Sequence, residues 1–214
     1  MILYGSTMSP FVRKVVAFAA EKQIALELKP VAIGDPDPGF AAASPFRKMP
    51  ALDDDGYVLA DSSAIIHYLE AKHPEPALIP ADPKERGRTI WFDEFADTIL
   101  FACGGTIFFN RIVAPRFLKR DGDLSAADAA ERVTLPPLLD YLDGVIPESG
   151  FLVGDRLTLA DLAVASPFAN LAHCGVAIDA GRYPKVTQYI EAILSRPSFA
   201  GSVERETAFL ARTA

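Results

Sequence analysis

Cysteine and histidine are scarce in this chain of 214 residues, and their scarcity excludes several kinds of site. The two cysteines, Cys103 and Cys174, stand far apart and share neither a CxxC motif nor a metal-binding spacing. The three histidines are scattered in the same way. Because zinc sites and dithiol redox centres need ligands at characteristic spacings, we expect two buried free thiols and no metal.

Long apolar runs and an excess of basic charge are also missing. No stretch reaches the roughly 18 consecutive apolar residues of a membrane span, and no basic leader of the kind found in signal peptides precedes the first apolar run. The net charge of −7 argues against general nucleic-acid binding, which depends on Lys and Arg contacts to phosphates. We therefore expect a cytoplasmic protein that binds neither membranes nor nucleic acid.

The first 76 residues alternate between strand and helix signals. Residues 2–4 are apolar and predict a short strand. Ser9-Pro10 is a favoured helix opening, and apolar residues at helical spacing extend that helix to about residue 23. Residues 24–33 partly alternate and predict a second strand, which Pro30 restricts to the edge of a sheet.

Residues 34–50 are rich in proline and glycine and predict a loop with at most one helical turn. Two short apolar runs then flank the string "DDDG", which indicates a hairpin. Asp61-Ser62 caps a further helix that stops at Pro74. The expected order is strand, helix, strand, short helix, two hairpin strands and helix.

Residues 73–83 contain four prolines and predict an interdomain linker. Beyond them only helices are expected, over about 84–118, 125–146, 158–173, 184–195 and 198–211, with a bend or a close backbone approach at Gly104-Gly105. Thr158 and Asp161 form a capping-box pattern that we interpret as structural. The predicted domains are residues 1–76 and 85–214, joined by a linker over 77–84.

Three segments of the first domain carry groups that suit a small ligand. The N-terminus of the helix at Asp61-Ser62 can hold a carboxylate, while the Asp61 side chain can accept from an ammonium group. Met49-Pro50 is a candidate cis bond that would turn the Met49 backbone toward a peptide ligand. Ser9 can accept a cap bond from its helix and donate its single proton to a ligand. The adjacent basic pairs Arg13-Lys14 and Arg47-Lys48 suit an anion, although solvated surface charges explain them equally well.

Four motifs, "SPFVRKV", "RKMPAL", "LADSSAIIHYLE" and "FLVGDRLTLADLAVAS", occur in this order along the chain. In order and spacing they resemble cytosolic glutathione transferases of the serine type, and the resemblance covers nearly the whole chain. It implies a thioredoxin-like α/β domain (βαβ-α-ββα) followed by an all-α helical domain. It also implies glutathione as co-substrate and a homodimer as the usual assembly.

The resemblance assigns a role to each matching residue. Ser9 matches the serine that activates the glutathione sulfur, and serine in place of cysteine disfavours thiol exchange. Met49-Pro50 matches the pair whose backbone binds the cysteinyl part of glutathione, and Lys48 matches a lysine that reaches the glycyl carboxylate. Asp61-Ser62 matches a Glu-Ser pair that binds the γ-glutamyl end, with aspartate one carbon shorter. Arg47 replaces a residue that is often small or polar, and it has no assigned role.

Several alternatives remain open at this point. Tyr4 is the rival of Ser9, since tyrosine-type classes carry their residue on the first strand, and Ser6 is a further candidate. The expected reaction is attack of the thiolate on an apolar electrophile, but glutathione-dependent isomerisation, dehalogenation or ether cleavage would use the same site. A non-catalytic interaction protein is a third alternative. The predicted electrophile groove consists of Met8, Phe11, Phe95, Ile99, Cys103, Thr106 and Phe109.

Overall fold

The computed structural model describes residues 1–212 and divides into two compact units. The first unit is Met1–Ile79, and the second begins at Pro80. The division falls inside the segment 77–84 in which the prolines predict a linker.

The first unit contains a four-stranded sheet with strand order β2-β1-β3-β4. Its strands are β1 (Ile2–Tyr4), β2 (Glu27–Lys29), β3 (Ala51–Asp54) and β4 (Tyr57–Ala60). β2 runs parallel to β1, whereas β3 pairs antiparallel with both β1 and β4. The predicted hairpin and the edge position of β2 are confirmed, but β2 is much shorter than the predicted 24–33. It ends directly before Pro30, which has no N–H to donate to a neighbouring strand.

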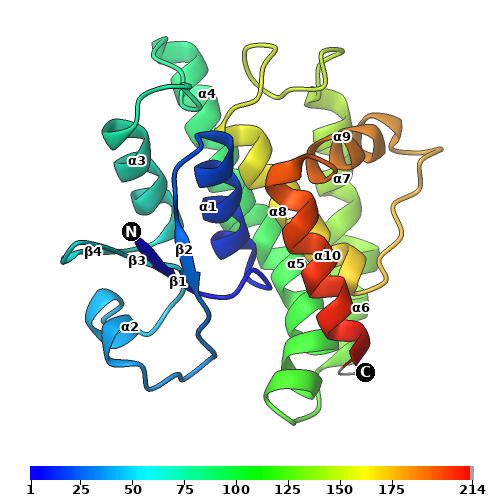
Figure 1. The fold of residues 1–214 in the computed structure, drawn as a ribbon. Coiled ribbons are helices and arrows are strands. Elements are labelled where there is room, and N and C mark those ends of the chain that lie inside the picture. Colours follow the sequence, from blue (N-terminus) through cyan, green and yellow to red (C-terminus); the bar gives the residue numbers. More distant parts are fainter. Residues whose placement is uncertain (213–214) are drawn as a thin grey trace. The chain divides into compact units, whose positions relative to one another are not determined.

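Three helices flank this sheet: α1 (Pro10–Glu21), α2 (Pro38–Ala43) and α3 (Ser62–Lys72). Figure 1 shows α1 and α3 above the sheet and α2 below it. Because side chains alternate along a strand, Tyr4 and Ala51 face α2, where they pack with Phe40. The observed order of elements matches the predicted βαβ-α-ββα arrangement of a thioredoxin-like domain.

The second unit is entirely helical within the described residues. Its first helix is continuous over Pro83–Phe117 and comprises α4 (Pro83–Glu94), η1 (Phe95–Leu100), α5 (Phe101–Phe108) and η2 (Phe109–Phe117). The other segments are α6 (Leu124–Ala129), η3 (Ala130–Thr134), α7 (Leu135–Val145), α8 (Leu159–His173), α9 (Pro184–Leu194) and α10 (Pro197–Arg212). All five predicted helices are present.

The backbone irregularities of the long helix do not lie where its glycines suggest. The segments η1 and η2 are π-helical, with hydrogen bonds one residue longer than in an α-helix. Gly104-Gly105 lies between them in regular α5. A Cβ at Gly104 would make an ordinary 3.6 Å contact with Leu171 of α8. The structure therefore has wider turns on both sides of the glycines and regular α-helix at the glycines themselves.

Among the described residues, one helix, Pro83–Phe117, has the length and apolar composition that could cross a membrane. Core helices of soluble proteins pass the same test. This helix contributes buried side chains to the core of its unit, among them Phe92, Leu100 and Ile107, and α4 and α5 pack against α8.

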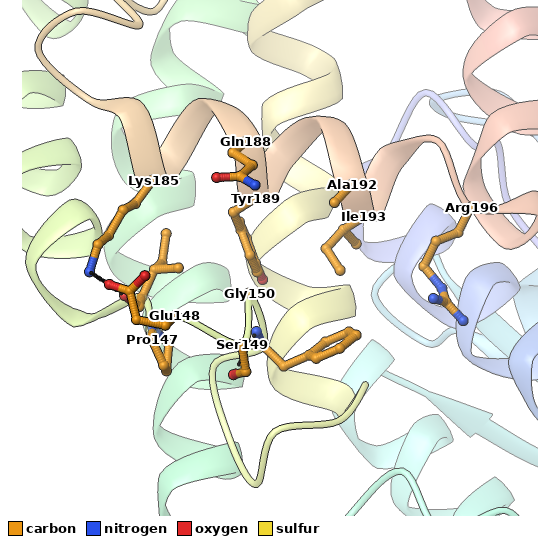
Figure 2. Close-up of a pocket in the computed structure, with 12 residues that line it drawn as sticks. Pro147, Glu148, Ser149, Gly150, Lys185, Gln188, Tyr189, Ala192, Ile193 and Arg196 are labelled. Atoms are coloured by element: carbon orange, nitrogen blue, oxygen red, sulfur yellow. Dashed lines mark hydrogen bonds and ion pairs between the residues drawn. The ribbon is translucent and has the colours of Figure 1, made fainter.

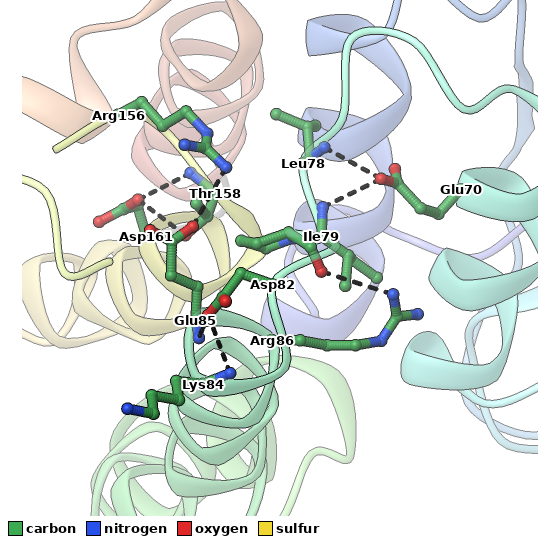
Figure 3. Close-up of polar contacts among 11 residues, drawn as sticks. Glu70, Leu78, Ile79, Asp82, Lys84, Glu85, Arg86, Arg156, Thr158 and Asp161 are labelled. Atoms are coloured by element: carbon green, nitrogen blue, oxygen red, sulfur yellow. Dashed lines mark hydrogen bonds and ion pairs between the residues drawn. The ribbon is translucent and has the colours of Figure 1, made fainter. Parts of the chain in front are cut away.

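Two carboxylates, the partly buried Glu70 and the buried Asp161, bind the backbone of neighbouring loops (Figure 3). Glu70 of α3 accepts from the backbone N–H groups of Leu78 and Ile79 at 3.1 and 3.0 Å and pairs with the buried ammonium of Lys22 at 2.6 Å. Asp161 of α8 accepts from the N–H of Thr158 at 2.8 Å, as the capping-box pattern predicts, and also from Leu152 N–H at 2.8 Å. Each carboxylate thus ties a proline- or glycine-rich connection to a helix.

Candidate functional site

The register of the sheet brings the predicted ligand-binding segments of the first unit to one edge. Tyr4, the last residue of β1, lies opposite Ala51, the first residue of β3, and Ala51 lies opposite Ala60, the last residue of β4. Neighbouring strands are about 4.8 Å apart. The loop to Ser9, the Met49-Pro50 peptide and the Asp61-Ser62 helix start therefore leave the sheet side by side.

Ser9 occupies the N-cap position of α1, but its hydroxyl does not cap the helix. Its backbone is extended (φ −81°, ψ 125°), and its carbonyl accepts from Arg13 N–H at 3.0 Å. The side chain makes no cap bond, and within residues 1–212 it has no hydrogen-bond partner. The expectation that this hydroxyl accepts a cap bond is therefore wrong, because the backbone alone closes the first turn. Its proton and both lone pairs are available to a ligand.

The rival residue Tyr4 has a different environment. Its side chain is 4% exposed and packs in the core with Phe40, the two ring centroids being 6.2 Å apart. The ammonium of Lys29 lies 5.3 Å from the centre of the same ring. Ser6, the third candidate, accepts a 3.4 Å hydrogen bond from Met8 N–H. Tyr4 is thus a core residue of the α2 face, as its apolar neighbours in the sequence suggest.

The Met49-Pro50 bond is cis, as predicted, and a second cis bond at Glu75-Pro76 was not predicted. The backbone of Met49 has no hydrogen-bond partner in the part of the chain that the structure describes. The preceding residue, Lys48, is held by Ser44, whose hydroxyl accepts from Lys48 N–H at 2.9 Å and donates to Lys48 C=O at 2.7 Å. The exposed ammonium of Lys48 has no carboxylate partner among residues 1–212.

Asp61 and Ser62 form the start of α3, as their sequence predicts. Asp61 is the N-cap, and its Oδ1 accepts from Ala64 N–H at 3.0 Å. Its φ of 84° lies in a region that residues other than glycine rarely adopt. One carboxylate oxygen is thus engaged by the helix, while Oδ2 has no partner among the described residues. Ser62 is buried.

The two adjacent basic pairs of the sequence have different environments. Arg13 and Lys14 are buried, and the Lys14 ammonium lies 3.4 Å from the hydroxyl of Ser63. Arg47 and Lys48 are exposed in the loop between α2 and β3. Of the four cations, only this second pair is open to a soluble anion.

Two family models match the chain. The glutathione S-transferase N-terminal domain matches residues 3–77, and the glutathione S-transferase C-terminal domain matches residues 109–202. Together these matches cover well over half of the sequence. The chain belongs to the glutathione S-transferase family.

Individual relatives agree with this assignment. Glutathione S-transferase F13 from Arabidopsis thaliana is 31% identical over 208 residues, which cover 93% of each chain. Probable maleylacetoacetate isomerase 1 from Drosophila melanogaster is 29% identical over 177 residues, covering 79% of this chain and 68% of the relative. Among solved structures, glutathione transferase F7 from Populus trichocarpa superposes with a TM-score of 0.83 at 29% identity, covering 95% of this chain and 97% of the other.

In this member of the glutathione S-transferase family, the residues of the predicted groove differ in exposure. Ile99 and Phe109 of the long helix are 42% and 38% exposed. Phe95 is instead buried in the helical unit and packs on Tyr141, with ring centroids 5.3 Å apart. Thr106 is partly buried, and its hydroxyl donates to Ala102 C=O at 2.8 Å. In the first unit, Met8 and Phe11 are half-buried.

Cys103, the remaining residue of the predicted groove, faces the interior of the helical unit. Its sulfur donates to Ala130 C=O at 3.4 Å, and burial raises the pKa of its thiol to about 11. Burial also raises the pKa of Cys174, to about 12. Both thiols are free and would remain protonated at neutral pH. Cys103 is buried as expected, but Cys174 is only partly buried, so the expectation of two buried thiols is wrong for Cys174. Among residues 1–212, no group of three or more His, Cys, Asp or Glu side chains could hold a metal ion.

The helical unit also contains a hollow of about 240 Å³ that sequence patterns did not predict (Figure 2). It lies between the loop that follows α7 and one face of α9, and Phe151, Lys185 and Tyr189 are among its lining residues. The ammonium of Lys185 is already engaged by Ile146 C=O and by Glu148, both at 3.2 Å. No residue of the predicted glutathione site lines this hollow, and the Lys185 cation at its wall is already paired. We assign it no role.

Proposed function

We propose that this protein is a glutathione transferase that binds glutathione at the sheet edge of the first unit and directs its thiolate at an apolar electrophile. The observation that carries the proposal is the free hydroxyl of Ser9. It stands at the start of α1, beside the two other segments that leave the same sheet edge. A serine needed only to cap the helix would have this hydroxyl engaged.

The proposed role of Ser9 is to donate a hydrogen bond to the bound sulfur. A serine hydroxyl is too weak an acid to lose its proton at neutral pH, so it cannot act as a base. Its hydrogen bond instead stabilises the thiolate form of the glutathione sulfur. A free thiol has a pKa of about 8.5, and a helix N-terminus lowers it further. If the pKa of the glutathione thiol falls by about two units, the thiolate becomes the major form at neutral pH. Each unit corresponds to about 1.4 kcal/mol of thiolate stabilisation.

The remaining contacts follow the charges of the ligand. The free Oδ2 of Asp61 suits the γ-glutamyl ammonium, and Ser62 with the start of α3 suits its carboxylate. The unpaired backbone of Met49 suits β-type pairing with the cysteinyl part. The unpaired ammonium of Lys48 suits the glycyl carboxylate. Each end of glutathione thus meets a group of opposite charge.

The electrophile, the assembly and the biological setting are parts of the same proposal. We infer an apolar electrophile. Among the predicted groove residues of the helical unit, Ile99 and Phe109 have the most exposed apolar side chains. By similarity to the family, we infer a homodimer that acts in detoxification in the cytoplasm.

Glutathione binding tests the proposal directly. We expect the protein to be retained on immobilised glutathione and its melting temperature to rise with glutathione concentration, because a ligand of the native state stabilises it by mass action. Ser62→Ala should raise the dissociation constant, with Ser125→Ala, at an exposed residue of α6, as the matched control. A protein that neither binds the resin nor gains thermal stability is not a glutathione transferase.

A second candidate reaction has one specific observation in its favour. The similarity to a protein named probable maleylacetoacetate isomerase 1 supports glutathione-dependent isomerisation at the same site. A panel of aromatic halides, epoxides, aryl ethers and cis-enone acids separates the two: conjugation consumes glutathione, whereas isomerisation regenerates it. Glutathione binding without turnover of any of these substrates would favour a non-catalytic interaction protein.

A further inference from the structure

Arg47 adopts a backbone conformation that its side chain does not favour. It lies in the loop between α2 and β3 and has a φ of 54°, in the left-handed region where a Cβ is crowded and glycine is the usual residue. Sequence patterns assign no role to this arginine. Unfavourable backbone conformations tend to persist where the surrounding structure requires them, and they cluster at ligand-binding sites.

The turn around Arg47 is closed by one buried side chain. Arg47 N–H donates to Ser44 C=O at 2.9 Å. The Ser44 hydroxyl, which is almost fully buried, binds both the N–H and the C=O of Lys48. The backbone of Lys48 is therefore fixed on both sides, and the left-handed residue between Ser44 and Lys48 completes the turn.

The side chain of Arg47 fastens this turn to a second segment. Its guanidinium donates to Asp35 C=O at 2.8 Å. Asp35 is itself held, because its carboxylate accepts from Ala32 N–H at 3.1 Å and from Asp37 N–H at 3.0 Å. A glycine at position 47 would relieve the backbone but would leave the turn without this attachment.

We propose that Arg47 is a positioning residue, whose attachment to Asp35 holds the turn so that the Lys48 ammonium meets the terminal carboxylate of the ligand. This inference rests on the proposed function, in which Lys48 binds the glycyl carboxylate of glutathione. It adds that recognition of this carboxylate depends on a residue that does not touch it. The hydrogen bond to Asp35 offsets part of the cost of the left-handed backbone at Arg47.

A double-mutant cycle tests whether Arg47 acts through Lys48. We would measure glutathione affinity by calorimetry for Arg47→Gly, Lys48→Ala and the double variant. A charge-assisted contact at a partly exposed site corresponds to roughly tenfold in affinity, so we expect about tenfold for Lys48→Ala and about fivefold for Arg47→Gly. Because the effects share one contact, the double variant should match Lys48→Ala within about twofold.

A truncated ligand separates positioning from general stability. γ-Glutamylcysteine lacks the glycyl carboxylate, so Arg47→Gly should bind it as well as the unsubstituted protein does. Arg47→Lys, which can still donate to Asp35 C=O, should restore most of the affinity for glutathione. Gln23→Gly is the matched control, because Gln23 is also exposed and left-handed (φ 56°) in the same unit, and its affinity for glutathione should not change.

Any of four results would overturn the inference. Additive losses in the double variant would mean that Arg47 acts independently of Lys48. Equal losses for glutathione and γ-glutamylcysteine, or a lowered melting temperature in Arg47→Gly, would mean a purely structural role. Unchanged glutathione affinity in Arg47→Gly would remove the role altogether. If the unsubstituted protein binds no glutathione, the proposed function fails instead, and the two failures are thereby told apart.

Discussion

Ser9→Ala is the substitution that separates a structural from a chemical role most cleanly. It removes one oxygen and leaves the backbone and Pro10 unchanged. The Ser9 hydroxyl makes no cap bond, and the first turn of α1 is closed by the Ser9 carbonyl, 3.0 Å from Arg13 N–H. The structure therefore predicts two effects of very different size, one on folding and one on bound glutathione.

The effect on folding should be small. Losing a serine that caps a helix through its side chain costs about 1 kcal/mol, whereas substitutions that break no such contact usually stay within about 0.5 kcal/mol. We expect Ser9→Ala to fall in the second range in urea unfolding. Asp37→Ala is the control, because the Asp37 carboxylate does cap α2, accepting from Phe40 N–H at 2.8 Å, and should cost about 1 kcal/mol or more.

The effect on the bound thiol should be large. A hydrogen bond to a charged group contributes about 1.5 to 3 kcal/mol, which corresponds to a shift of about one to two pKa units. If the pKa of bound glutathione lies about two units below 8.5, Ser9→Ala returns it to between about 7.5 and 8.5. The thiolate then changes from the major to the minor form at pH 7.

Ultraviolet absorbance of the thiolate in the protein–glutathione complex, titrated from pH 5 to 9, measures this shift. Ser9→Ala should bind glutathione with little change in affinity, but its thiolate band should appear at a pH about one to two units higher. Ser6→Ala is the matched control and should leave the titration unchanged. An unchanged band in Ser9→Ala would refute the reasoning and transfer the role to Tyr4 or Ser6. A loss of about 1 kcal/mol in stability would refute the absence of a cap bond.

Three further predictions concern stability. Burial raises the pKa of Asp161 from 3.8 to about 6, so the stabilisation from its protonated form is fully present below pH 4 and is lost as the pH rises through 6. The unfolding free energy of the protein relative to that of Asp161→Asn should therefore fall by about 3 kcal/mol over this pH range. A difference that does not change with pH would contradict the raised pKa. Gly39→Ala should destabilise the protein by about 1 to 3 kcal/mol in thermal unfolding, because the new Cβ would clash with the hydroxyl of buried Tyr4. Gly144→Ala is the control: its new Cβ would have no neighbouring atom within 4 Å, so the substitution should be neutral or stabilising by up to about 1 kcal/mol. Glu70→Gln should cost about 3 kcal/mol in urea unfolding, because it leaves its buried lysine partner without a countercharge; a cost below about 1 kcal/mol would mean that water replaces the carboxylate.

Local signals in the sequence predicted most of the fold. Pro10, the "DDDG" turn and the Asp61-Ser62 start each act within a few residues, so their helix and strand boundaries could be predicted without tertiary contacts. The same holds for the capping box at Thr158 and Asp161. Sequence patterns failed where an outcome depends on distant residues. The start of β2 depends on its pairing with β1. The burial of Arg13-Lys14 depends on which face of α1 packs against the rest of its unit.

The candidate site divides in the same way. The sequence by itself determined which segments carry the candidate binding groups, namely the two helix starts and the residues before β3. Caps, prolines and the family motifs are local patterns, so they can be recognised without tertiary contacts. Only the tertiary structure decided that Tyr4↔Ala51↔Ala60 pairing brings these segments to one edge, since strand register is a long-range property. It also decided that the Ser9 hydroxyl is left without a partner and that Arg47 reaches Asp35, twelve residues earlier in the chain. Both depend on the direction in which a side chain points, which is fixed by tertiary packing and cannot be predicted from local sequence patterns.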